Sequence, residues 1–164
     1  SLEIGNTSLS AEITNVFDNN QLVISYSKQN SETKHVLEAW FKFLFLRASG
    51  QELQTVFLIR ERDHPLVFKP SMVTQEEAKI LLSELIEKFI EGHRLPLPFL
   101  PKWSCTTVID EKKYKRSLEA ELKYNEYAIV LNNEGYFDLH NLDRKLFDEL
   151  GNMIFGKFAE ELKV

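Results

Sequence analysis

The stretch that decides the fold is AEITNVFDNNQLVISYSK, residues 11–28. Its two apolar runs, residues 13–17 and 22–26, are rich in β-branched and aromatic side chains, as is typical of strands. The residues between them, 18–21, are polar and tolerate the backbone angles of a tight turn. This stretch therefore predicts a β-hairpin near the start of the chain.

The hairpin resembles the active-site hairpin of PD-(D/E)xK nucleases, which carries one acid on the first strand and an acid-x-Lys triplet on the second. In those enzymes the carboxylates hold Mg²⁺, a hard cation that prefers oxygen ligands, and the lysine helps to position the attacking water. The matching positions here are Thr14, Ser25 and Ser27. Hydroxyl groups alone make a poor Mg²⁺ site, so we expect a nuclease layout without its catalytic residues. The alternative is an unrelated hairpin that resembles such a site by accident.

Composition favours one compact domain over residues 1–164, because the chain is 43% hydrophobic and too short for two comfortable domains. Its first residue, Ser1, suggests a fragment of a longer polypeptide.

A single cysteine, Cys105, excludes an internal disulfide and suits a reducing, cytoplasmic location. The net charge of -5 argues against a surface that binds nucleic acid everywhere, although it allows a local basic patch. No apolar run reaches the roughly 20 residues of a membrane span.

An apolar run at residues 36–46 predicts a buried helix that begins with a cap at 31–34 and ends at Ser49 and Gly50. Its two charges, Glu38 and Lys42, are four residues apart and are expected to pair. Residues 54–60 and 65–68 read as further strands. The predicted order of this part is β-β-α-β-β.

The second half of the chain begins with a capping box at residues 74–77, which predicts a helix that ends at Gly92. Residues 95–101, the proline strap, contain three prolines and are expected to run extended. A charged helix is predicted at 110–124, and an amphipathic helix from about Leu142. The apolar side of that last helix is formed by Leu146, Leu150, Met153, Ile154 and Phe158.

Two motifs carry a resemblance to a known family. LEAWF at residues 37–41, which leads into ASG at 48–50, and PLPFLPK at 96–102 are similar in order and spacing to the C-terminal region of RecC, the gamma subunit of exodeoxyribonuclease V. The similarity runs from the hairpin into the helix after Trp103 and carries no recognised pattern beyond Tyr124.

The resemblance implies an α/β, restriction-endonuclease-like domain, a mixed sheet flanked by helices, that lacks catalysis and needs no cofactor. It further implies RecB-like and RecD-like helicase and nuclease subunits as partners, and forked or single-stranded DNA guided through their complex during double-strand-break repair. The chain contains no GxxxxGK[ST] phosphate loop, so an ATP site would belong to a partner.

Two other functions remain open. The first is an active metal-dependent nuclease of the same fold, for which the chain offers three acid-x-Lys triplets in helical patterns that lack an upstream strand acid. They are Glu111 with Lys113, Glu121 with Lys123, and Glu161 with Lys163. The second is a general protein-interaction module without a link to DNA repair.

Candidate DNA contacts lie in two basic segments. The first is the run Lys112, Lys113, Tyr114, Lys115 and Arg116, whose charges suit phosphates and whose tyrosine suits stacking on a base. The second is Arg60 and Arg62, beside His64 in a predicted turn. An ordinary solvated helix face and an ordinary exposed turn are the alternatives, and acidic neighbours dilute the first segment.

Metal and covalent chemistry have weak support in the sequence. The histidines, His35, His64, His93 and His140, lack the spacing of a zinc site, and we predict no metal. Cys105 is expected to be a structural thiol. On the proline strap and just after it, Phe99 and Trp103 are candidate contacts to a partner protein, or else fasten this segment to its own domain.

Overall fold

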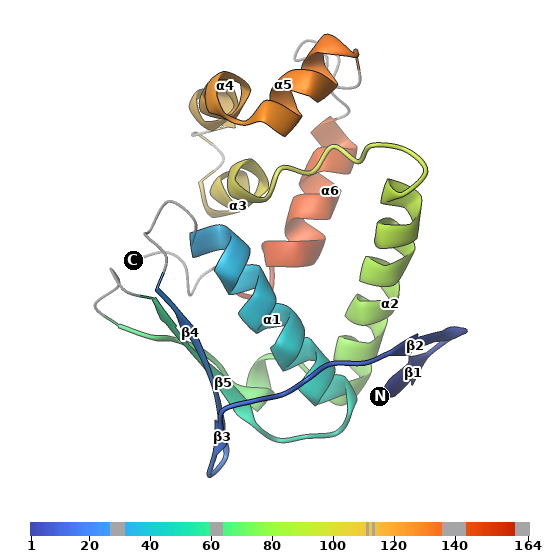
Figure 1. Cartoon of the computed structure of the whole chain (residues 1–164), viewed down its shortest axis with the longest axis vertical. Coiled ribbons are helices and arrows are strands. Elements are labelled where there is room, and N and C mark those ends of the chain that lie inside the picture. Colours follow the sequence, from blue (N-terminus) through green and yellow to red (C-terminus); the bar gives the residue numbers. More distant parts are fainter. Residues whose placement is uncertain (27–31, 60–63, 111, 113, 136–143, 160–164) are drawn as a thin grey trace. The chain divides into compact units, whose positions relative to one another are not determined.

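The computed structural model of the chain describes residues 1–26, 32–59, 64–110, 112, 114–135 and 144–159 (Figure 1). The side chains of Glu32, Tyr114, Lys115 and Ser117 lie outside this description. The chain divides into two compact units, Ser1–Glu87 and Lys88–Val164. Each unit has a buried core of its own.

A four-stranded mixed sheet forms the centre of the first unit, in the order β3-β4-β5-β6. The strands are β3 (Val16–Phe17), β4 (Asn20–Ser25), β5 (Gln54–Ile59) and β6 (Leu66–Phe68). Antiparallel pairs form the two edges, whereas β4 and β5 are parallel, with α1 (Glu32–Ala48) connecting them. The mixed sheet and the predicted order β-β-α-β-β are confirmed.

Helix α1 packs on one face of this sheet (Figure 1). Successive side chains of a strand point to opposite faces. Val23 of β4, Phe57 of β5 and Phe68 of β6 are buried on the face that α1 covers. Trp40 of α1 lies against this face, with its ring centroid 5.3 Å from that of Phe68. The helix ends at Ala48 and is followed by a turn at Gly50, whose φ of 79° is easily adopted by glycine.

Polar contacts on α1 and α2 (Gln75–Gly92) match the sequence patterns. The predicted ion pair joins Lys42 Nζ to Glu38 Oε1 at 2.8 Å, and the lysine's hydrogen bond lowers the pKa of Glu38 below its ordinary value of 4.5. The capping box is also present, because Thr74 Oγ1 accepts a hydrogen bond from the N-H of Glu77 and the Glu77 carboxylate accepts one from the N-H of Thr74. The proposed cap at Ser31 lies outside the described residues.

The first unit also contains elements that the sequence patterns did not predict. An antiparallel hairpin, β1 (Leu2–Ile4) and β2 (Thr7–Leu9), turns at Gly5, whose φ is 56°. A short 3-10 helix, η2 (Pro70–Met72), precedes α2.

Helices build the second unit: α3 (Pro101–Ile109), α4 (Tyr114–Tyr124), α5 (Glu126–Asn133) and α6 (Arg144–Phe155). The rings of Trp103 and Phe147, whose centroids are 4.0 Å apart, lie in its core. Helices α3 and α6 approach closely at Gly151, where an added Cβ would lie 3.1 Å from Val108 Cγ2. The rest of this core consists of Leu100, Leu118, Ala128 and Leu131.

The helical predictions for this unit are partly confirmed. The amphipathic helix near the end is α6, and Leu150 and Ile154 of its predicted face are buried. Phe158 is also buried, but it lies beyond the last residue of α6, Phe155. The charged helix begins at Tyr114 and not at 110, whereas α3 and α5 were not predicted. Pro101 is the first residue of α3, so only residues 95–100 of the strap lack regular structure. None of the described helices is both long and apolar enough to span a bilayer.

Candidate functional site

The predicted hairpin is present, but its first strand is shorter than expected. Strand β3 contains only Val16 and Phe17, which pair with Gln21 and Asn20 of β4. Asp18 begins the turn with a φ of 50°. The prediction of a strand over residues 13–17 is wrong, because Asn15 adopts a φ of 55°, a left-handed conformation that interrupts an extended strand.

The nuclease-like positions do not meet on paired strands. Ser25 is 7% exposed and lies in β4 opposite Ile59 of β5, on the face that α1 covers. Thr14 is exposed and precedes β3, and Ser27 lies outside the described residues. If the β3-β4 register continued beyond its observed pairs, the residue opposite Ser25 would be Glu12 and not Thr14. Within the described ranges, no group of three or more acidic, histidine or cysteine side chains is placed to hold a metal ion.

A buried polar pair that no sequence pattern predicted lies at the start of β4. Gln21 and Thr55, 1% and 0% exposed, face each other across the parallel strands, and Thr55 Oγ1 donates to Gln21 Oε1 at 3.0 Å. Beside them, the Gln54 amide donates to Asn20. A shift in register would separate these partners, so the pair favours the alignment that places Ser25 opposite Ile59.

A second buried polar group, Arg47, connects the end of α1 to the segment before α2. Its side chain is 6% exposed, and its Nε donates to the carbonyl of Val73 at 3.1 Å. Its Nη1 donates to the carbonyl of Gln51 at 2.9 Å and to the Glu52 carboxylate at 2.8 Å. An arginine at the end of an apolar helix was the available sequence signal, since basic side chains suit helix C-termini.

The face of the sheet that points away from α1 exposes apolar side chains. Ile24 and Leu58, neighbours across β4 and β5, are 46% and 37% exposed. Phe17 at the end of β3 and Tyr26 directly after β4 are also exposed. The consecutive apolar residues Leu22, Val23 and Ile24 were the signal, because every second residue of a strand must face away from the covering helix.

Of the predicted DNA contacts, the structure describes only the side chains of Lys112 and Arg116, and both are exposed. Lys113, Arg60 and Arg62, together with the side chains of Tyr114 and Lys115, lie outside the description. This set of residues therefore remains a prediction.

Among the acid-x-Lys triplets, the one described is that of Glu121 and Lys123, and it lies within α4. Glu121 is 8% exposed and accepts a hydrogen bond from Asn125, whereas Lys123 lies over the ring of Tyr124. No paired strand carries this triplet, so it lacks the layout of a nuclease site. The triplets at 111–113 and 161–163 lie outside the described residues in whole or in part.

The aromatic partner candidates lie within their own unit. Trp103 is 1% exposed in the core, which matches the alternative that it fastens its segment to its own domain. Phe99 is half-buried, with its ring 6.1 Å from that of Phe155. Cys105 is buried, and His93 packs its ring against Phe89.

Comparison with known proteins identifies the family. The family model described as RecC C-terminal domain matches residues 1–111. Two curated relatives, each named RecBCD enzyme subunit RecC, from Mycobacterium tuberculosis strains CDC 1551 and H37Rv, are 31% identical over 99 residues, or 59% of this chain. The chain spans only 9% of the length of these relatives. No solved structure matches. The chain thus belongs to the RecC C-terminal domain family.

Proposed function

We propose that this chain is a non-catalytic domain of an exodeoxyribonuclease V gamma subunit. In this role it holds RecB-like and RecD-like subunits and helps to guide DNA strands through a cytoplasmic complex that repairs double-strand breaks. The match of residues 1–111 to the RecC C-terminal domain is the observation that carries the proposal.

The hairpin supports a restriction-endonuclease-like ancestry with the catalytic groups lost. The antiparallel hairpin of β3 and β4 is followed by α1 and then by β5, which lies parallel to β4, and this order resembles the part of such nucleases that carries their acids. In this chain the second-strand position is Ser25, a nearly buried hydroxyl. A hydroxyl supplies no negative charge for Mg²⁺, so we infer a scaffold that kept its framework and lost its metal ligands.

The face of the sheet that points away from α1 supports a role in holding a partner subunit. Ile24 and Leu58 form an apolar patch on paired strands, and such patches on soluble proteins commonly mark interaction sites. Lys112 and Arg116 supply exposed positive charge suited to a DNA backbone, in the region directly after the residues that match the family.

A cleavage assay tests the absence of catalysis. The chain is incubated with single-stranded, double-stranded and forked DNA in Mg²⁺ or Mn²⁺, and we expect no cleavage above that of a buffer blank. Glu12→Gln is the matched variant, because Glu12 is the carboxylate that an extended hairpin register would place opposite Ser25. Cleavage by the chain that Glu12→Gln abolishes would establish the rival function, an active nuclease.

An association assay tests the scaffold role. The full-length gamma subunit that carries this domain is co-purified with RecB-like and RecD-like subunits, with Ile24→Glu on the sheet face and Ile80→Glu on α2 as matched variants. We expect Ile24→Glu to weaken the recovery of a partner and Ile80→Glu to leave it unchanged, because a charge buried in an apolar interface is costly. Equal recovery with both variants would remove the sheet face from the proposal. Failure of the unsubstituted subunit to recover either partner would refute the scaffold role.

A further inference from the structure

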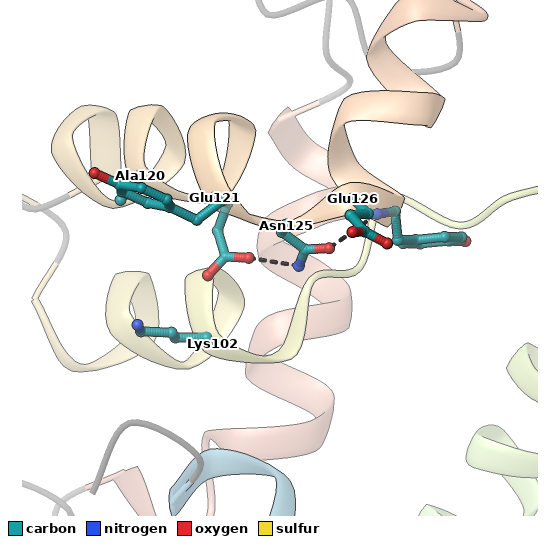
Figure 2. A pocket seen from close by; sticks show the side chains of 7 residues that line it. Lys102, Ala120, Glu121, Asn125 and Glu126 are labelled. Carbon is teal, nitrogen blue, oxygen red and sulfur yellow. Dashed lines mark hydrogen bonds between the residues drawn. The ribbon is translucent and has the colours of Figure 1, made fainter.

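The second unit contains a pocket of about 480 Å³ where the first turn of α3 lies near the junction of α4 and α5 (Figure 2). Apart from Lys102 and Ala120, its lining consists of Glu121, Tyr124, Asn125, Glu126 and Tyr127. All of these residues except Lys102 lie beyond the residues that match the family. An inference about the pocket therefore does not depend on the proposed function.

Glu121 supplies a carboxylate that is held in place and only partly satisfied. It is 8% exposed, and its Oε2 accepts a hydrogen bond from Asn125 Nδ2 at 2.6 Å (Figure 2). No donor from the described part of the chain reaches its second oxygen, Oε1, which is also not sealed from solvent. A fixed carboxylate with an open acceptor favours a ligand that donates hydrogen bonds and carries positive charge.

The pocket is unsuited to an anion, although a helix begins beside it. The start of a helix can bind phosphate through its free N-H groups. Here the Asn125 side chain already accepts from the N-H groups of Tyr127 and Ala128, at 3.1 and 3.3 Å. Two carboxylates, Glu121 and Glu126, also outnumber the one lining lysine. Phosphate groups of DNA would therefore meet repulsion and few free donors.

Aromatic rings complete a site for a cation. Tyr124 and Tyr127 are 74% and 54% exposed, and the face of an aromatic ring attracts a positive charge. Tyr124 already shows this property within the chain, because Lys123 Nζ lies 5.1 Å from its ring centroid. Tyr127 supplies a second ring for an incoming group.

We propose that this pocket binds an arginine side chain of a partner protein. The guanidinium group donates to Glu121 Oε1 and interacts with the Glu126 carboxylate, while its plane lies on the ring of Tyr127. Arginine suits the site better than lysine, because its planar group has several donors in fixed directions, stacks on aromatic rings and is more weakly hydrated.

The test titrates the peptide acetyl-Gly-Arg-Gly-amide into the ¹⁵N-labelled chain and follows the backbone amides of Asn125 and Tyr127. We expect saturable shifts with a dissociation constant on the order of 1 mM, as suits one anchoring side chain. Glu121→Gln should weaken binding about tenfold through loss of the charged acceptor. Tyr127→Leu should weaken it about threefold through loss of the ring. Circular dichroism establishes that each variant remains helical.

Matched probes and a control variant decide the outcome. Glu119→Gln removes an exposed charge from the same helix outside the pocket and should leave binding unchanged. The absence of saturable shifts, or an equal loss with Glu119→Gln and Glu121→Gln, would overturn the proposal. Equal affinity for acetyl-Gly-Lys-Gly-amide would overturn the assignment to arginine. Tighter binding of thymidine monophosphate at the same residues would replace it with a nucleotide site.

Discussion

Replacement of Thr55 by valine tests whether the buried polar pair fixes the parallel strands of the sheet. Valine has nearly the shape of threonine, so Thr55→Val removes the hydrogen bond to Gln21 Oε1 with little change in packing. Gln21 is 1% exposed, so its oxygen loses its donor in a place that water reaches poorly. A buried acceptor left in this state costs about 1–3 kcal/mol.

The assay must report on the first unit by itself. The chain has two tryptophans, Trp40 in the first unit and Trp103 in the second. Urea unfolding is therefore followed by the fluorescence of Trp40, with reference and variant both carrying Trp103→Phe. A loss of about 1.5 kcal/mol with a slope of about 1.5 kcal/mol/M lowers the unfolding midpoint by about 1 M, with the slope unchanged.

Two further variants are needed: one is a control, and the other tests whether Thr55 acts through Gln21. Thr14→Val, at an exposed threonine before β3, should change stability by less than about 0.5 kcal/mol. Gln21→Leu combined with Thr55→Val should recover most of the loss, because replacing both partners by apolar groups leaves no unpaired acceptor. A Thr55→Val variant as stable as its reference, or a double variant whose loss is the sum of the single losses, would refute the reasoning.

The remaining predictions concern two charged residues of α1. Arg47→Met should destabilise the first unit by about 2–4 kcal/mol in the same urea assay, because the carbonyls of Val73 and Gln51 lose a donor. Arg144→Met, at a half-exposed ion pair in α6, should change stability by less than about 1 kcal/mol, and equal losses would contradict this account. Glu38→Gln should cost about 0.3–0.5 kcal/mol at neutral pH. Since folding lowers the pKa of Glu38, its contribution is present above the ordinary value of 4.5 and disappears as the pH falls through the lower folded pKa, so the two unfolding curves should converge in acid. A difference that persists there would show that Lys42 does not cause it.

Local patterns predicted much of the first unit, because its signals lie within a few neighbouring residues. The capping box at Thr74 and the glycine stop at Gly50 are examples. The second unit was harder to predict, because its local signals are compatible with more than one structure. Pro101 was interpreted as the end of an extended strap, although proline also suits the first position of a helix, and Asn125 was not recognised as the cap of α5.

The candidate sites depended on contacts between distant residues, which sequence patterns do not specify. Thr55 and Gln21 are 34 positions apart, and only the parallel register brings their polar atoms together. The interruption of the strand at Asn15 could not be predicted either, because asparagine is compatible with both a strand and a left-handed conformation. The pocket at Glu121 requires α3 to lie near the junction of α4 and α5, a contact absent from any local pattern.

Under the proposed function, the environment of Ser25 gives a physical reason why a nuclease scaffold would persist after the loss of its acids. This position lies on the face of the sheet that also buries Val23, Phe57 and Ile59 under α1. A carboxylate there would be removed from water and would need a metal ion or a basic partner to offset the cost of its charge. A serine hydroxyl carries no such cost, so its presence lets this face pack as ordinary core. Under the proposed function, loss of the metal ligands therefore removes the cost of burying a carboxylate, and the fold remains available to bind partners.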